Sequence, residues 1–434
     1  MRALADLHRF DTDFGPHLLM ADGSRIYAID QELDRALQSA AASDPRALQA
    51  MLADAGLASL GFIGEGRIVD PPLRSVSLSV AQKCNLGCTY CYAQQGDFGG
   101  APRDMPAEVA EAALQLLFKT ATAGERVNVA FLGGEPLTNR KLIRSATARA
   151  IELAAGRNVQ VGFAMTTNAT LLTPDDAEFF AQHGFAVTVS LDGDAAVQDA
   201  QRPFKGGNGS YARTIARLAP LLALQDRVQV FARVSVTPRN LEIGRVLEHL
   251  ANLGFRSVGF SPVLTSPSGA GTLQGEDLET LLAQMISCGR DFVDQAICGA
   301  RPVFANLASA LIEIHRGTHR PYPCGAGAGY AGVGADGGLY ACHRFVGDDA
   351  GALGDVHDGM DRGRQQQWLD DRAVDRQTPC TTCWARYLCG GGCHHEVIHA
   401  GRPACDFIRG WLHFCLQAYV AISERAPGYF ERSA

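Results

Sequence analysis

Between residues 73 and 264, short apolar segments alternate with longer segments in which apolar residues recur at helical spacing. Such alternation is typical of a parallel sheet with crossover helices. The expected strands are residues 76–80, 127–132, 159–165, 186–191, 228–236 and 257–262, and the expected helices are residues 106–120, 140–155, 174–183, 211–224 and 241–253. Six units are too few for a closed eight-stranded barrel, and in such folds chemistry concentrates at the carboxyl ends of the strands. The sequence therefore predicts an α/β fold with functional groups after its strands.

Three closely spaced cysteines follow the first expected strand. Cys84, Cys88 and Cys91 form a C-x3-C-x2-C pattern. An iron–sulfur cluster that only carries electrons takes four cysteines, so three thiolates leave one iron open for a ligand that takes part in chemistry. A zinc knuckle and a set of buried thiols are the alternatives, because cysteine also packs as a small hydrophobic residue.

The second expected strand ends in Gly133-Gly134-Glu135-Pro136. The two glycines would let the backbone approach a ligand without a Cβ atom in the way. Glu135 would supply an acceptor for a cationic amine. An ordinary strand-to-helix turn is the alternative interpretation of these four residues.

The ordered motifs of residues 73–262 resemble those of the radical S-adenosylmethionine (SAM) family. The resemblance implies a partial (β/α)6 barrel and a [4Fe–4S] cluster on Cys84, Cys88 and Cys91, whose open iron chelates SAM. For Arg233 two roles stay open, binding the SAM carboxylate or pairing with Asp192 inside the barrel. The positions that match SAM-contacting residues of the family are Tyr90, Gly133, Gly134, Glu135, Asn168, Ser190 and Arg233.

A second series of cysteines occupies the C-terminal quarter of the chain. Paired C-x2-C spacings usually indicate zinc. However, the order of a cysteine, a Gly-x4-Cys segment and a C-x2-C-x5-C-x3-C segment resembles the SPASM extension of radical SAM enzymes, which binds two auxiliary iron–sulfur clusters. The matching positions are Cys324, Cys342, Cys380, Cys383, Cys389, Cys393 and Cys405.

The resemblance divides these cysteines in a crossed way. Auxiliary cluster I would take Cys324, Cys342 and Cys393, and auxiliary cluster II would take Cys380, Cys383, Cys389 and Cys405. Cys415 is the alternative last ligand, although it falls in an expected helix over residues 407–423. Some relatives supply a fourth ligand to cluster I from a cysteine soon after the first, and residues 325–341 contain none. Cluster I would then be open at one iron, or completed by Cys415, a non-cysteine group or the substrate.

The N-terminal region has a pattern of its own. Residues 17–20 and 25–29 flank an Asp22-Gly23 turn and predict a β-hairpin, and residues 31–41 and 45–55 predict two helices. This small α+β outline resembles the winged-helix peptide-recognition domain of peptide-modifying enzymes, and a simple cap on the next domain is the alternative. The expected domains are 1–72, a barrel over 73–264, a helical bridge over 265–320 and a cysteine-rich SPASM domain over 321–434.

Two helices are expected in the bridge, over residues 277–298 and 305–316. They contain Cys288 and Cys298, which we interpret as buried thiols.

Charge and composition exclude several classes of protein. A formal net charge of −7 argues against a sequence-independent nucleic-acid binder, which needs a basic face. No segment approaches the ~20 apolar residues of a membrane span, and the first ten residues lack a secretory core. The chain has thirteen cysteines, most of them in two groups, which favours metal binding in a reducing compartment over disulfides. We expect a cytoplasmic protein with no nucleic-acid or membrane partner.

The resemblance implies an enzyme that oxidatively modifies a ribosomally made peptide or protein. The layout most resembles that of the thioether-forming maturases, including those for quinohemoprotein amine dehydrogenase and six-cysteine peptides, and a flavodoxin or ferredoxin would donate electrons. Carbon–carbon cross-linking and anaerobic sulfatase maturation are alternative activities, and an iron–sulfur electron carrier is a remote one. Sulfatase maturases place an aspartate directly after the Gly-x4-Cys cysteine, whereas His343 follows Cys342 here.

Overall fold

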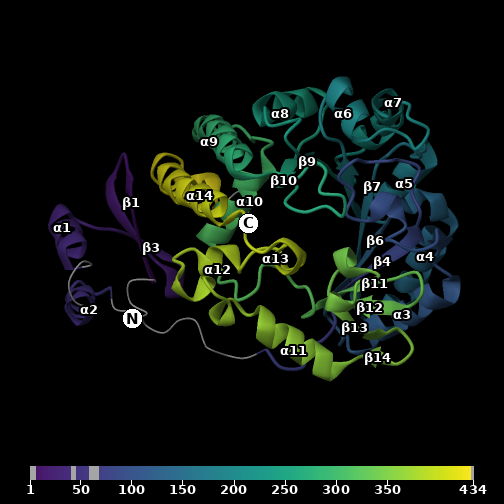
Figure 1. The fold of residues 1–434 in the computed structure, drawn as a ribbon, viewed down its shortest axis with the longest axis horizontal. Helices are drawn as coiled ribbons and strands as arrows, with labels where there is room; N and C mark the ends of the chain where they lie inside the picture. The colour runs from purple at the N-terminus through teal and green to yellow at the C-terminus, as the bar shows by residue number, and fades with distance from the viewer. Residues whose placement is uncertain (1–5, 41–44, 58–67, 432–434) are drawn as a thin grey trace.

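The computed structural model describes residues 6–40, 45–57 and 68–431. Its centre is a curved parallel sheet whose strands are ordered β4-β6-β7-β8-β9-β10 (Figure 1). The six strands are β4 (Ser75–Gln82), β6 (Arg126–Gly133), β7 (Gln160–Thr167), β8 (Phe185–Ser190), β9 (Gln229–Val236) and β10 (Val258–Pro262). All neighbouring pairs are parallel, which confirms the predicted α/β fold.

Helices cover one face of this sheet. They are α3 (Ala107–Lys119), α4 (Arg140–Arg157), α5 (Pro174–Gln182), the short α6 (Ala195–Gln201), α7 (Tyr211–Leu222) and α8 (Ile243–Asn252). Figure 1 shows them on the outer side of the curved sheet. Residues alternate accordingly along each strand. On β6, Val127, Val129 and Phe131 are fully buried, whereas Ala130 and Leu132 remain partly accessible on the inner face.

Strands from the C-terminal region extend the sheet beyond β4. Strand β11 (Tyr330–Val333) pairs in parallel with β4, and β12 (Gly338–Tyr340), β13 (Ala352–Asp355) and β14 (Gly359–Met360) continue it antiparallel. The β11–β12 connection contains the predicted Asp336-Gly337 turn. The short β5 (Arg103–Asp104) pairs with the end of β4. Because β4 is an interior strand, its polar Ser77 and Ser79 are fully buried.

Three long helices form a second layer beside the sheet. Helix α14 (Cys405–Arg425) packs against α9 (Gly275–Ile297) and α10 (Ala305–His315), as Figure 1 shows. The packing is close, because a Cβ atom at Gly410 would lie 2.5 Å from Leu282. Cys288 is buried in α9 as predicted, but the prediction for Cys298 is wrong, since it follows the last turn of α9 and is exposed.

The N-terminal residues form a separate sheet with the order β1-β2-β3. Strands β2 (Gly15–Met20) and β3 (Arg25–Ala28) are the predicted hairpin, and β1 (Leu7–Thr12) was not expected. The predicted helices are α1 (Gln31–Ala40) and α2 (Pro45–Asp54). Strand β1 contacts α14, where Gln417 Nε2 donates to Asp11 O at 2.9 Å. Parts of the predicted 1–72 domain, at residues 1–5, 41–44 and 58–67, lie outside the described residues.

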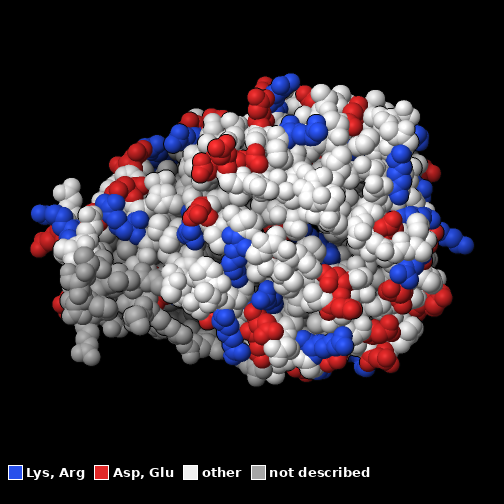
Figure 2. All heavy atoms as spheres, in the orientation of Figure 1, with Lys and Arg blue, Asp and Glu red and all other residues white. Residues whose placement is uncertain are grey.

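The remaining C-terminal helices are short. They are α11 (Arg362–Arg372), α12 (Arg386–Cys389) and α13 (His394–Ala400). Within the described residues, no helix combines the length and apolar character needed to cross a membrane. On the face shown in Figure 2, acidic and basic side chains are interspersed, without a continuous basic area.

Candidate active site and cysteine groups

The first three cysteines converge in the loop after β4. Burial chiefly raises the pKa of Cys84 to about 11 and that of Cys88 to about 12, and the neighbouring Cys91 thiol contributes to both shifts. Thiols with such pKa values stay protonated at neutral pH unless a metal displaces the proton. A converging, partly buried group of three thiols with no disulfide partner fits an iron–sulfur cluster.

Glycines bring the β6 turn directly against this loop. Gly134 N donates to Ala81 O at 2.8 Å, and a Cβ atom on Gly134 would lie 2.8 Å from the Gly96 Cα atom. A Cβ atom on Gly96, which has a φ of +99°, would lie 2.7 Å from the Cys84 Cβ atom. The sequence predicted that glycine at the turn admits a ligand. The structure shows that it also admits the backbone of the cysteine loop.

The Glu135 carboxylate joins the ends of two strands. It is fully buried and accepts hydrogen bonds from Thr167 Oγ1 at 2.7 Å, Asn168 N at 2.8 Å and Leu137 N at 3.1 Å. Burial raises its pKa, and these hydrogen bonds act in the opposite direction. These three hydrogen bonds fix the carboxylate between the ends of β6 and β7, and its contact with the SAM amino group stays a prediction.

Asn168 and Ser190 lie at neighbouring strand ends, as predicted. Asn168 Nδ2 donates to Asn85 Oδ1 at 3.0 Å and lies 3.8 Å from Cys84 Sγ, so this side chain is fixed against the cysteine loop. Ser190 is partly accessible and faces Arg233 in the β8–β9 register.

A buried charged group connects the cysteine loop to β8. The Tyr90 hydroxyl donates to Asp192 and accepts from Arg202 Nη1 at 2.7 Å, and Arg202 lies 3.9 Å from Asp192. Asp192 therefore pairs with Arg202, and the alternative pairing with Arg233 is wrong. Arg202 stands in no motif that could have marked it. A buried pair of this kind is costly to break, because either partner alone would be an uncompensated charge.

Arg233 instead points toward the C-terminal region. Its side chain is accessible and lines a cavity with Gly259 and Asn306, on the inner side of the sheet. Desolvation and the neighbouring Arg344 lower the pKa of Arg233, and Glu396 raises it. The guanidinium is thus free of the Asp192 pair and available to an anionic ligand.

The structure brings Cys324, Cys342 and Cys393 together. Burial raises the pKa of Cys342 to about 12, and the other two thiols add to that shift. The Cys389–Cys393 connection consists of three glycines with positive φ. A Cβ atom on the first, Gly390, would lie 2.5 Å from Pro323, so glycine is needed for Cys393 to approach Cys324.

A second group lines a cavity beside the first. Its cysteines are Cys380, Cys383, Cys389 and Cys405, and Cys393 of the first group also lines this cavity. Cys405 is the first residue of α14 and interacts electrostatically with Cys380. Cys415, by contrast, is fully buried among apolar residues of α14, and burial alone raises its pKa. The geometry therefore favours Cys405 over Cys415 as the last ligand of this group.

His343 lies between the cysteine groups and the sheet. Its Nδ1 atom is 2.9 Å from the Tyr330 hydroxyl, which is 2.7 Å from Ser77 Oγ. Burial, Arg344 and Arg233 lower the pKa of His343 to about 4. The imidazole is consequently neutral at physiological pH.

Comparison with known protein families identifies the central part of the chain. Residues 78–231, which span β4 to β9, match the radical SAM superfamily and form a radical SAM domain. The serine-type anaerobic sulfatase-maturating enzyme of Klebsiella aerogenes is 25% identical over 345 residues, which cover 76% of this chain and 82% of that enzyme. The cysteine-type anaerobic sulfatase-maturating enzyme of Clostridium novyi is 23% identical, and the match covers 75% of this chain and 89% of that enzyme.

Solved structures share the fold beyond that domain. The structure of hexahistidine-tagged anSMEcpe with bound AdoMet has a TM-score of 0.68 at 19% identity, covering 84% of this chain and 99% of that one. Streptococcus suis SuiB bound to the precursor peptide SuiA has a TM-score of 0.54 at 16% identity, and the match covers 91% of this chain and 95% of SuiB. The radical SAM domain and the cysteine-rich C-terminal region are consistent with SAM and [4Fe–4S] clusters as cofactors.

Proposed function

We propose that this chain is a radical SAM enzyme that joins a cysteine sulfur of a ribosomally made peptide or protein to a carbon of another residue. When bound, the cofactors supply a 5′-deoxyadenosyl radical, which abstracts hydrogen from an unactivated carbon. The protein's own residues would hold the clusters and orient the peptide. The observation that carries the proposal is the three-thiol group of Cys324, Cys342 and Cys393.

This group has no fourth cysteine of its own. All thirteen cysteines of the chain lie in the described residues. Cys415 is in the apolar core of α14, and Cys405 interacts with Cys380 and thus belongs to the neighbouring group. Three thiolates leave a coordination position that a substrate thiolate can fill. Arg233 and Arg344, which lie close to each other, would favour an anionic substrate group nearby.

The proposal assigns the ligands as the cysteine geometry groups them. Cys84, Cys88 and Cys91 hold the SAM-cleaving cluster, and Ser190 and Asn168 stand at strand ends suited to contact SAM. The auxiliary ligands are Cys324, Cys342 and Cys393 for cluster I, and Cys380, Cys383, Cys389 and Cys405 for cluster II. A flavodoxin or ferredoxin is the proposed electron donor.

Sulfatase maturation is the second candidate, because the Klebsiella and Clostridium relatives carry that name. Against it stands His343, at the position where the resemblance expects an aspartate. A neutral, buried imidazole can accept a proton, but it differs in charge and reach from a carboxylate.

Mass spectrometry of a modified peptide tests the proposal. The chain would be coexpressed with each short open reading frame beside its own gene. The control is the Cys84→Ala variant of the chain, coexpressed with the same reading frames. We expect the precursor to lose two hydrogens per cross-link and to protect one thiol from alkylation. Replacing that cysteine of the precursor by serine should prevent both changes.

Other outcomes would identify the alternatives. The same mass loss with every thiol still alkylated would replace the thioether by a carbon–carbon bond. A hydrazide-reactive aldehyde formed on a sulfatase-derived peptide, with no change in the precursor, would establish sulfatase maturation instead.

A further inference from the structure

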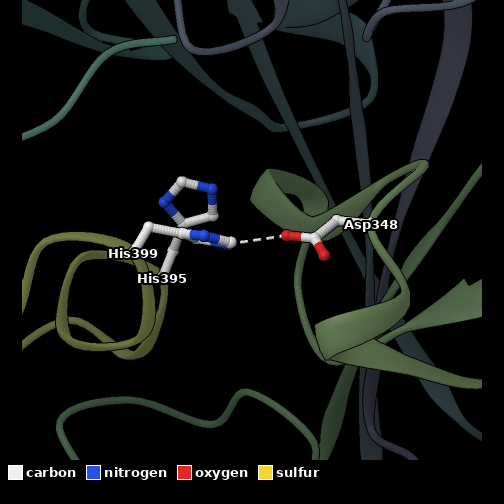
Figure 3. A group of neighbouring side chains, drawn as sticks. All are labelled: Asp348, His395 and His399. Atoms are coloured by element: carbon white, nitrogen blue, oxygen red, sulfur yellow. Dashed lines mark hydrogen bonds and ion pairs between the residues drawn. The ribbon is translucent and has the colours of Figure 1, made fainter. Parts of the chain in front are cut away.

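Two histidines and an aspartate form a cluster outside the cysteine groups. His395 and His399 belong to α13, and Asp348 directly precedes the 3₁₀ turn Asp349–Gly351. One donor atom from each side chain lies within 4.8 Å of the other two. Figure 3 shows the two imidazoles beside each other on α13, with His399 directed at the Asp348 carboxylate and its Nε2 atom 2.7 Å from Asp348 Oδ2.

The two histidines belong to an H-E-x-x-H segment, residues 395–399, which was not among the predicted sites. Residues four apart on a helix lie on the same face, so this spacing presents both imidazoles to one ligand. In zinc proteases the glutamate of such a segment is a general base. Here Glu396 Oε1 accepts from Arg344 Nη1 at 2.8 Å, and both side chains are less than one fifth exposed. Because Glu396 is paired with Arg344, it is not available as a general base, so a metal bound here would not catalyse hydrolysis.

His395 has a second feature that points to a ligand. Its Nδ1 atom is buried and has no hydrogen-bond partner, while its ring packs against Phe345 at a centroid distance of 5.0 Å. A buried polar atom without a partner costs free energy, and such an atom in a folded protein calls for an explanation. A metal ion is a partner that an imidazole nitrogen accepts readily.

We propose that Asp348, His395 and His399 bind one divalent cation of the zinc type, with water completing the coordination. Two imidazoles and one carboxylate are a donor set that zinc accepts, whereas calcium and magnesium prefer oxygen ligands alone. The ion would be a clamp between α13 and the segment before Asp349. Cys393 directly precedes α13, and Cys342 lies six residues before Asp348. An influence of the clamp on auxiliary cluster I rests on the proposed function, because that function includes the cluster. Binding of the cation itself does not rest on it.

Metal analysis of the full-length protein tests this site. The chain is reconstituted anaerobically so that iron–sulfur clusters occupy the thiols, treated with Zn²⁺ and freed of excess metal by gel filtration. We expect wild type, and the control His357→Gln at an exposed histidine, to retain one more zinc per chain than His395→Gln/His399→Gln. Iron content of the three proteins should agree, and Co²⁺ should give visible d–d absorption without a thiolate charge-transfer band.

Equal zinc in wild type and the double variant would overturn the proposal and leave Asp348–His399 as a plain ion pair. A thiolate charge-transfer band, or zinc gained as iron is lost, would place the metal on cysteines and also overturn it. Should the double variant not fold, Asp348→Asn removes the carboxylate charge and must lower zinc retention. Failure of the proposed function would appear separately, as an unmodified or fully alkylatable precursor in the mass spectrum, and would leave zinc retention unchanged.

Discussion

Cys84→Ala, Cys88→Ala and Cys91→Ala should each reduce reductive cleavage of SAM to the background rate. The three thiols converge after β4, and a cluster that must keep one iron open for SAM has no spare protein ligand. Loss of any one thiolate therefore removes the cluster that starts the reaction. The measurement is 5′-deoxyadenosine release by the anaerobically reconstituted protein with dithionite and SAM.

Cys288→Ala is the matched control. This thiol is buried in α9, and a Cβ atom on Gly244 of α8 would lie 3.6 Å from its sulfur. Removing it should cost about 1 kcal/mol of stability and leave cleavage unchanged. If Cys288 proved as necessary as Cys84, the assignment of ligands to the loop after β4 would be wrong.

Gly134→Ala should lower SAM cleavage about 100-fold, because displacement of reacting groups by about 1 Å has effects of that size. The added methyl group would press on the Lys83 carbonyl and lie 2.8 Å from the Gly96 Cα atom. Both neighbours are backbone, which cannot rotate away, so the cysteine loop must shift. Iron content and 5′-deoxyadenosine release measure the damage.

Gly156→Ala provides the steric control for this substitution. Gly156 lies in α4, and nothing lies within 4 Å of the position of its added Cβ atom. Alanine there should stabilise the helix by up to about 1 kcal/mol and leave cleavage as in wild type. Full activity in Gly134→Ala would show that the close approach of the turn to the cysteine loop is not required.

The central strands could be predicted because each is a short apolar segment between helices with regular spacing. Strand β1 was missed because its sequence, Leu-His-Arg-Phe-Asp-Thr, is mostly polar and buries only Phe10 completely. The pairing of β11 with β4 was also missed, since it joins residues about 250 positions apart. Ser77 suits a buried strand only because the Tyr330 hydroxyl from β11 reaches it.

Cysteine spacing identified the thiol groups, while features that depend on tertiary contacts remained hidden. The Arg202 partner of Asp192 comes from a segment with no motif. The hydrogen bonds that Glu135 accepts from Thr167 and Asn168 join the ends of two strands, so the sequence alone did not reveal them. The H-E-x-x-H segment begins two residues after Cys393, and its partner Asp348 is distant in sequence, so only the fold reveals the cluster.

Iron and sulfide analysis tests the central claim, that the cysteines hold three clusters in three groups. The reconstituted wild-type protein should contain about 12 iron and 12 sulfide per chain, and a variant with Cys380, Cys383 and Cys389 replaced by alanine about 8 of each. Mössbauer spectra should show [4Fe–4S] clusters in both. A wild-type protein with about 4 iron per chain and zinc on its C-terminal cysteines would contradict the account.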